Sequence, residues 1–259
     1  EDLLFNYSIE TGAIVYIYRF PNVFGKWCRP NYNSAIATFC HNITRDLPIQ
    51  VNDRSVVMNL VYIDDVVSEL ISALNHEVIK HGQYCKMSIT HQATLGEIVD
   101  YIYSFKESRN LRTVPDVSNP LVKKLYSNYL SYLPEDQFSY ELKMNVDHRG
   151  SFTEFIKTID RGQVSVNVSK PGITKGNHWH HTKNEKFLVV SGTGVIRFRH
   201  IESTKIIEYF VSGEKLEVVD IPVGYTHNIE NLGSTDMVTI MWANEAFDPE
   251  HPDTFFMEV

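Results

Sequence analysis

The sequence predicts an α/β fold in the first half of the chain and an all-β sandwich or barrel in the second half. Up to about residue 133, helical patches alternate with short apolar strands, a pattern typical of a parallel sheet with crossover helices. After residue 139, short strands alternate with turns that contain glycine. Prolines lie between the two patterns, so we predict domains over residues 1–134 and 135–259.

Apolar spacing in the first half predicts strands over residues 14–20 and 59–63, and helices over residues 66–74 and 95–105. The first strand is expected to be buried. Thr94 is a suitable N-cap for the second helix, and Asp64 or Asp65 for the first. Strands that alternate with helices in this way suggest an α/β domain with a parallel sheet.

The second half contains two apolar runs on either side of the sequence Ser-Gly-Thr-Gly. These runs cover residues 185–190 and 195–200. Short strands joined by a glycine-containing turn are typical of a β-hairpin. We therefore predict that these two strands pair with each other.

Composition narrows the partners and the compartment. The net charge of −8 is spread along the chain, which disfavours nucleic acid and anionic membranes as partners. A few local basic residues would still suffice to bind a diphosphate. Cys28, Cys40 and Cys85 are odd in number and lack paired spacing, which favours a reducing compartment. No apolar run has membrane-spanning length and the start resembles no signal peptide, so we expect a cytoplasmic protein without membrane insertion.

Four potential metal ligands occur in two segments of the second half. His178 and His180 are two residues apart, so both imidazoles face the same side of a strand. Glu185 begins the next predicted strand, and His227 follows a Pro-x-Gly turn. His181 would point to the opposite face. Three imidazoles and a carboxylate suit Zn, Fe, Ni or Mn, and we expect a divalent metal with zinc as the preferred candidate.

These two segments resemble the two motifs of the cupin superfamily. Residues 172–192 match the pattern G-x5-H-x-H-x4-E-x6-G, and residues 222–231 match P-x-G-x2-H-x3-N. The glycine that opens the second family motif lies further away here, at Gly213. The resemblance covers residues 139–259 and implies a jelly-roll β-barrel that binds a metal. It leaves the chemistry open, because cupins include enzymes, storage proteins and sensors.

Residues 147–154 read D-H-R-G-S-F-T-E. From the residues alone, a plain turn with a salt-bridged Arg149 is the favoured interpretation. The segment resembles, however, the D-x-R-G-x-F-x-E segment of dTDP-4-dehydrorhamnose 3,5-epimerases, which are cupin-fold enzymes without the metal motif. This resemblance implies that Arg149, Phe152 and Glu154 contact a nucleotide, in part across a dimer interface.

Two segments of the first half, YRFPNVFG at residues 18–25 and MNLVYIDDV at residues 58–66, resemble the C-terminal half of extended short-chain dehydrogenases/reductases. In that Rossmann-like class they flank a sugar-nucleotide pocket, and Asn22 is the candidate substrate contact. A turn-forming asparagine is an equally good interpretation. The resemblance covers residues 1–115. Neither a G-x-x-G-x-x-G loop nor a Tyr-x-x-x-Lys pair with an upstream Ser or Thr occurs, so we expect a truncated reductase that does not bind NAD(P).

An extended reductase joined to a metal cupin resembles the bifunctional capsular polysaccharide enzymes on the route to UDP-N-acetyl-L-fucosamine. The stretches YRFPNVFGKWCRPNYNSAIATFCHNI and GNHWHHTKNEKFLVVSG carry this resemblance. It implies that the cupin epimerises carbon 3 of a UDP-4-keto-6-deoxy-N-acetylhexosamine. It also implies that the intact protein reduces the 4-keto group with NADPH, giving UDP-N-acetyl-6-deoxy-L-talosamine.

Epimerisation next to a keto group needs a base, a group that stabilises the enolate, and an acid. Besides the metal ligand His180, the candidates are Lys175, Tyr225 and Asp220. Tyr225 lies two residues before His227 and would share its face, although a core tyrosine is the commoner case. Two alternatives remain open: an iron-dependent cupin oxygenase and a non-enzymatic module that binds sugar nucleotides.

Cupins commonly pair through barrel edge strands, so we expect a homodimer. The first half, lacking early strands, would expose a sheet edge and apolar surface. We therefore expect it to be partly disordered or stabilised by self-association.

Overall fold

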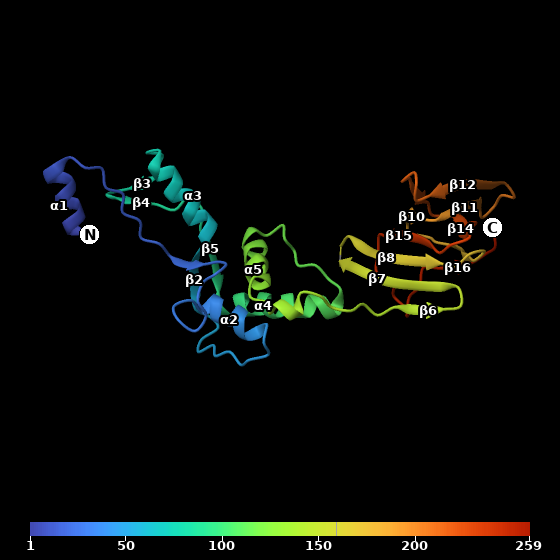
Figure 1. Cartoon of the computed structure of the whole chain (residues 1–259), viewed down its shortest axis with the longest axis horizontal. Helices are drawn as coiled ribbons and strands as arrows, with labels where there is room; N and C mark the ends of the chain where they lie inside the picture. Colours follow the sequence, from blue (N-terminus) through green and yellow to red (C-terminus); the bar gives the residue numbers. More distant parts are fainter. Residues whose placement is uncertain (159) are drawn as a thin grey trace. The chain divides into compact units, whose positions relative to one another are not determined.

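A computed structural model describes residues 1–158 and 160–259 of the chain. It divides into two compact units (Figure 1), each described here by itself. The first unit contains Glu1–Asn110 and Pro115–Ser139, and the second contains Leu111–Val114 and Tyr140–Val259. The main boundary between the units lies after Ser139, a few residues beyond the predicted boundary at residue 134. Leu111–Val114 joins the second unit because Arg112 pairs with Glu154 and Thr113 bridges Lys157.

The first unit consists of helices around a small sheet. Its helices are α1 (Asp2–Thr11), α2 (Ala35–Ile43), α3 (Ile63–Leu74), α4 (Leu95–Leu111), α5 (Pro120–Leu130) and the 3-10 turn η1 (Glu135–Gln137). Its strands are β1 (Asn22–Phe24), β2 (Val57–Tyr62), β3 (Lys80–His81), β4 (Tyr84–Cys85) and β5 (His91–Thr94). The order of the three-stranded sheet is β1-β2-β5. β1 and β2 are parallel as predicted, but β5 pairs with β2 antiparallel, so the sheet is mixed.

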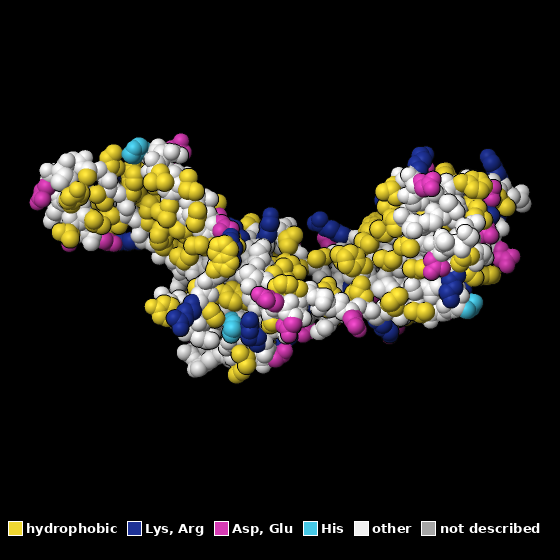
Figure 2. Space-filling view, viewed as in Figure 1, with side chains coloured by type: hydrophobic (Ala, Val, Ile, Leu, Met, Phe, Trp, Pro, Cys, Tyr) yellow, Lys and Arg dark blue, Asp and Glu magenta, His cyan; other side chains and the backbone are white. Residues whose placement is uncertain are grey.

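A large apolar cluster joins the sheet and the helices of this unit, and Val61, Val66 and Met87 form a smaller one. Leu60 of β2, Ile98 and Ile102 of α4 and Leu125 of α5 are fully buried and belong to one apolar cluster. By contrast, α1 buries none of its residues. Figure 2 shows hydrophobic side chains gathered over α1 and α3, where Leu74 is 80% exposed. The first unit therefore does expose the apolar surface that the sequence predicted.

Two predictions for this unit are wrong. Residues 14–20 do not form a buried strand: within them only Tyr18 forms an isolated bridge, to Cys85, and Ile14 is 64% exposed. A single bridge leaves the segment without the ladder that defines a strand. α3 begins at Ile63, before both aspartates proposed as its cap, and Tyr62 precedes it without a side-chain cap.

The start of α4 follows the prediction closely. The Thr94 hydroxyl accepts from the Glu97 amide, and the Glu97 carboxylate accepts from the Thr94 amide and hydroxyl. This reciprocal pair is a capping box. Within the described part of the chain, no helix combines the length and apolar character needed to cross a bilayer.

The second unit is a sandwich of two antiparallel sheets, a jelly roll of the cupin type. Its strands are β6 (Asn145–Asp147), β7 (Gly150–Thr158), β8 (Gly162–Ser169), β9 (Thr174–Trp179), β10 (Glu185–Ser191), β11 (Thr193–His200), β12 (Ile206–Ser212), β13 (Val218–Ile221), β14 (Tyr225–Asn231), β15 (Met237–Ala243) and β16 (Phe255–Phe256). The sheet orders are β13-β10-β15-β8-β7-β6 and β12-β11-β14-β9-β16. Phe187, Ile196 and Ile229 belong to the core between the sheets.

The hairpin predicted around Ser-Gly-Thr-Gly is wrong, although both of its strands exist. β10 pairs with β13 and β15 in the six-stranded sheet, whereas β11 pairs with β12 and β14 in the five-stranded sheet. The chain therefore crosses from one sheet to the other at Gly192. The turn signal is the same for a hairpin and for this crossing, because both need a sharp change of direction.

We expect Gly150→Ala to destabilise the second unit by about 2–4 kcal/mol, because backbone strain and overpacking each cost about 1–3 kcal/mol. The φ of Gly150 is +133°, and a Cβ there would lie 2.0 Å from the Val168 carbonyl oxygen. Gly172→Ala is the matched control, since its φ is +72° but nothing lies within 4 Å of the added carbon. It should cost only about 1 kcal/mol. Equal losses in denaturant unfolding would show that the contact with Val168 is unimportant.

Candidate metal centre

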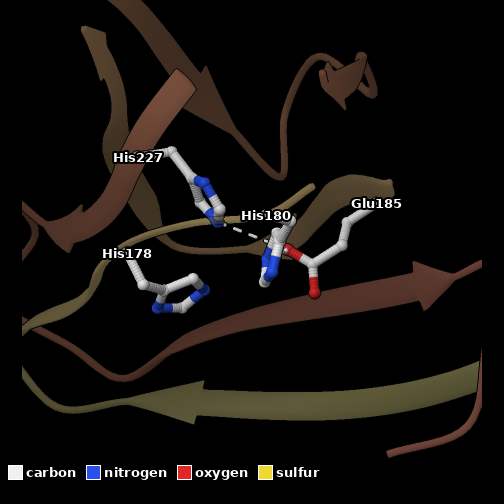
Figure 3. Close-up of side chains that lie close together, drawn as sticks. All are labelled: His178, His180, Glu185 and His227. Carbon is white, nitrogen blue, oxygen red and sulfur yellow. Dashed lines mark ion pairs between the residues drawn. The ribbon is translucent and has the colours of Figure 1, made fainter. Parts of the chain in front are cut away.

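Three strands bring the predicted metal ligands together inside the barrel. His178 lies on β9, His180 follows that strand directly, Glu185 begins β10, and His227 lies on β14. Figure 3 shows the four side chains pointing toward one another. Their ligand atoms all lie within 4.8 Å of each other. β10 belongs to one sheet and β9 and β14 to the other, so the cluster lies between the two sheets.

A bulge in β9 sets the alignment of the histidines. The ladder pairs His227 with His178 and Asn228 with Gly176, so Asn177 is the extra residue. Gly176 has a φ of +108°, and a Cβ there would lie 2.8 Å from the His227 carbonyl oxygen. The bulge therefore lets β9 approach β14 closely, with His178 opposite His227. His181 lies outside the cluster as predicted, and its ring packs on Trp179 with centroids 4.5 Å apart.

The cluster contains buried polar atoms without hydrogen-bond partners. These are Nε2 of His180, Nε2 of His227 and Oε2 of Glu185. The carboxylate oxygen lies 3.5 Å from the His180 nitrogen and 3.3 Å from the His227 nitrogen. Unpaired buried polar atoms cost free energy unless a ligand completes their bonding. A divalent cation fits these donors, because imidazole nitrogen and carboxylate oxygen are common metal ligands.

The protonation states of His178 and Glu185 suit a metal ion. Burial, reinforced by the neighbouring His227 and His180, lowers the pKa of His178 to about 4. Burial alone would raise the pKa of Glu185, but the adjacent His180 and His227 outweigh it and hold that pKa well below its usual range. A neutral imidazole and an ionised carboxylate are the forms that bind metals.

The cluster opens into a cavity of about 700 Å³ within the second unit. Lys175 lines it, and its Nζ donates to the Asn167 side-chain oxygen and to the Val168 carbonyl oxygen, both at 2.8 Å. Burial lowers the pKa of Lys175. Arg149 and Phe152 also line the cavity, and Arg149 forms an ion pair at 2.6 Å with Asp147. Three predicted site residues, Lys175, Arg149 and Phe152, thus line the same cavity as the four candidate metal ligands.

Other predicted site residues lie elsewhere. Tyr225 is not among the residues that line this cavity, and its ring lies 5.1 Å from that of His200. Asp220 forms an ion pair with Lys186 on the barrel exterior. These positions disfavour both as proton donors.

Two further predicted contacts have other partners. Glu154 pairs with Arg112 at 2.7 Å and lines a smaller neighbouring cavity of about 320 Å³. Asn22 lies in the first unit, where its amide donates to the Asn59 carbonyl oxygen at 3.2 Å. It lines a separate cavity there of about 830 Å³, beside Phe24.

Sequence reasoning missed Lys183. This lysine is 8% exposed and lines both the 700 Å³ and the 320 Å³ cavity, with its Nζ 5.7 Å from the centre of the Phe247 ring. No carboxylate of the described chain forms an ion pair with it. Its place in the turn between ligands His180 and Glu185 is the only sequence signal that could have identified it.

Comparisons with known proteins agree with this architecture. Residues 145–255 match the family model described as the polysaccharide biosynthesis C-terminal domain. The chain is 48% identical over 250 residues to the UDP-2-acetamido-2,6-beta-L-arabino-hexul-4-ose reductase of Pseudomonas aeruginosa, covering 96% of this chain and 67% of that protein. The spore coat polysaccharide biosynthesis protein SpsL of Bacillus subtilis is 25% identical over 123 residues, which is 44% of this chain and 82% of that protein.

A solved structure matches along the whole chain. The capsular polysaccharide assembling protein CapF from Staphylococcus aureus is 66% identical and superposes with a TM-score of 0.98. The match covers 100% of this chain and 75% of that protein.

Proposed function

This chain belongs to the CapF family of capsular polysaccharide proteins, and on that premise we propose that its second unit epimerises carbon 3 of a UDP-4-keto-6-deoxy-N-acetylhexosamine. One observation carries the proposal. Four side chains that could bind a metal, two of them buried, open onto a cavity that is also lined by the partly buried Lys175 and the buried Lys183.

The reaction needs a proton to leave carbon 3 and another to return on the opposite face. The 4-keto group acidifies that hydrogen, so a base of moderate strength suffices. We assign the removal of the carbon 3 proton to Lys175, because burial lowers its pKa and so makes the neutral amine more available. The proton that returns on the opposite face would come from solvent. His180, the other candidate from the sequence, would bind the metal through Nε2 while its Nδ1 donates to the Asp253 carbonyl oxygen, so it would have no free lone pair to remove the carbon 3 proton. Lys183 would supply positive charge to the enolate that forms.

His178, His180, Glu185 and His227 would hold the metal, for which zinc is the preferred candidate. A divalent cation held there supplies a Lewis acid beside the substrate. Arg149 would face the diphosphate of the sugar nucleotide, and Phe152 would face its nucleobase, since both side chains line the same cavity. The ion pair of Arg149 with Asp147 keeps its guanidinium in place before substrate arrives.

The first unit would provide the substrate side of a reductase. The Pseudomonas aeruginosa relative is named as a reductase of a UDP-hexulose, and this chain covers 67% of it. We propose that the intact protein uses NADPH to reduce the 4-keto group and that Asn22 contacts the sugar nucleotide. We also propose that the protein is a homodimer, which light scattering would test.

The direct test is exchange of the hydrogen on carbon 3. The chain is loaded with metal and incubated in deuterium oxide with the 4-keto UDP-sugar, and carbon 3 is followed by proton NMR. The proposal predicts deuterium at carbon 3, with equal rates in air and without oxygen. A metal-loaded protein that binds the sugar nucleotide without exchange would instead be a binding module. Turnover that requires oxygen would indicate an oxygenase.

A further inference from the structure

We propose that the C-terminal strap, residues 253–257, positions the metal centre, with Asp253 as the residue through which it acts. The inference rests on the metal-binding role proposed above for the four-residue cluster. It concerns a segment that lies more than 70 residues away in sequence from the histidine pair. The observations that carry it are contacts of one residue with both the ring of His180 and the turn that follows it.

Asp253 contacts the His180 imidazole through its backbone. The Nδ1 atom of His180 faces the Asp253 carbonyl oxygen at hydrogen-bond distance. A carbonyl oxygen only accepts, so Nδ1 carries the proton and donates it. The lone pair of the ring is therefore on Nε2, the atom that faces Glu185 in the cluster. Histidines that bind metals are commonly oriented in this way by an acceptor on the far nitrogen.

The Asp253 carboxylate holds the turn after His180. It accepts from the backbone amides of His181 at 2.9 Å, Thr182 at 2.7 Å and Lys183 at 2.8 Å. It also accepts from the Thr182 hydroxyl at 3.1 Å. One side chain thus satisfies three consecutive amides of the turn that joins ligand His180 to ligand Glu185. The same contacts fix the backbone of Lys183, whose side chain lines the cavity.

The rest of the strap is anchored along β9. In β16, Phe255 pairs with Trp179, and its ring lies 5.0 Å from the Trp179 ring and 4.9 Å from that of His181. The Met257 amide donates to the carbonyl oxygen of Asn177, the bulged residue between Gly176 and His178. The strap therefore contacts β9 at the bulge, at the outer face and at the turn. A segment bound at these three places fixes the strand that carries both histidines.

The strap gives the site a rigidity that its ligands alone do not provide. His180 lies beyond the end of β9, where its carbonyl oxygen accepts from the Gly224 amide at 3.1 Å and the turn that follows is held by the Asp253 carboxylate. Without the carboxylate, three amides of this turn lose their acceptor, and the carbonyl that orients the imidazole shifts with the strap. Loss of an outer partner of this kind typically weakens metal binding by about 10–100-fold.

The test compares Asp253→Ala and Asp253→Asn with Asp248→Ala in the full chain. Zn²⁺ affinity is measured by competition with a chromophoric chelator, and the Co²⁺-substituted proteins are compared by visible absorption. We expect Asp253→Ala to bind Zn²⁺ about 10–100-fold more weakly and to show a changed Co²⁺ spectrum. Asp253→Asn should lie between it and the unsubstituted chain, because an amide oxygen keeps the shape but accepts more weakly.

Asp248 is the matched control because it lies five residues before Asp253 and its carboxylate accepts from the amide of Glu250 rather than from the turn after His180. Asp248→Ala should bind metal like the unsubstituted chain. Circular dichroism of the metal-free proteins establishes that each variant is folded. If Asp253→Ala does not fold, the Zn²⁺ affinity of Asp253→Asn is the deciding measurement. We expect Asp253→Asn to bind Zn²⁺ more weakly than the unsubstituted chain. An unchanged Zn²⁺ affinity would overturn the proposal.

The outcomes separate this inference from the proposed function. A folded Asp253→Ala protein with unchanged Zn²⁺ affinity and Co²⁺ spectrum overturns the role of the strap and leaves the metal site intact. If the unsubstituted chain itself binds neither ion, the proposed metal centre fails and the role of the strap fails with it.

Discussion

The His227→Ala variant should lose its metal, and its rate of hydrogen exchange at carbon 3 should fall by more than about 100-fold. Removing a residue that only orients a metal ligand already lowers affinity or activity by about 10–100-fold, so removing a ligand itself should cost more. His227 is 1% exposed, and its Nε2 lies 3.3 Å from the Glu185 carboxylate. Its removal leaves three ligands and an unfilled space in the buried cluster. Metal content per chain and the exchange rate are the two measurements.

His200→Ala is the control for this change. His200 ends β11, and its ring packs on Tyr225 outside the cavity. This variant should keep both its metal and its exchange activity. A His227→Ala protein with full metal content and full exchange would contradict the assignment of the ligands.

The Lys175→Met variant should exchange carbon 3 about 10²–10⁴-fold more slowly, the usual contribution of a positioned acid or base. Methionine keeps much of the length and the apolar stem but cannot take a proton. Because Lys175 does not belong to the ligand cluster, metal content should be unchanged. The exchange rate is measured at saturating and at limiting substrate, together with metal content.

Lys170→Met is the matched control for this second change, because Lys170 is an exposed lysine of the same barrel. Its exchange rate should match that of the unsubstituted chain. If Lys175→Met raises only the KM and keeps kcat, the amine binds substrate equally in the ground and transition states. In that case Lys175 contributes binding, and the base is another group.

The grouping of the four candidate metal ligands could be predicted in part because a strand has a fixed side-chain period. His178 and His180, two residues apart, share a face whatever the strand pairs with. Glu185 and His227 came from the spacing of a known motif. The bulge at Asn177 that aligns the strands was not predictable, because pairing between β9 and β14 joins segments about 50 residues apart.

Predictions about pairing and about which face a side chain shows were less successful. Gly192 signals a sharp turn, yet the sequence does not tell whether the next strand returns beside β10 or joins the opposite sheet. Apolar residues at 14–20 indicate strand propensity, but burial depends on neighbours that pairing supplies. Tyr225 lies two residues before His227 on the same strand, yet it is not among the residues that line the cavity and instead packs against the barrel core.

Lys183 and Asp253 show why residues with the roles proposed here escape sequence reasoning. Lys183 has the character of a surface lysine in a turn, and only the fold buries it beside the cavity. Asp253 contacts His180 across 73 residues of chain. Neither the burial of Lys183 nor the contact of Asp253 with His180 follows from a local sequence pattern, because both depend on how distant segments pack around the site.

Removal and return of the metal test the central claim most directly. The chain is treated with a chelator until metal-free, and exchange at carbon 3 of the 4-keto UDP-sugar is measured in deuterium oxide before and after Zn²⁺ is added back. We predict that exchange falls in proportion to the metal removed, while far-UV circular dichroism shows a folded barrel, and that one equivalent of Zn²⁺ restores it. A folded, metal-free protein that exchanges carbon 3 at the original rate would contradict a role for the metal centre in the reaction.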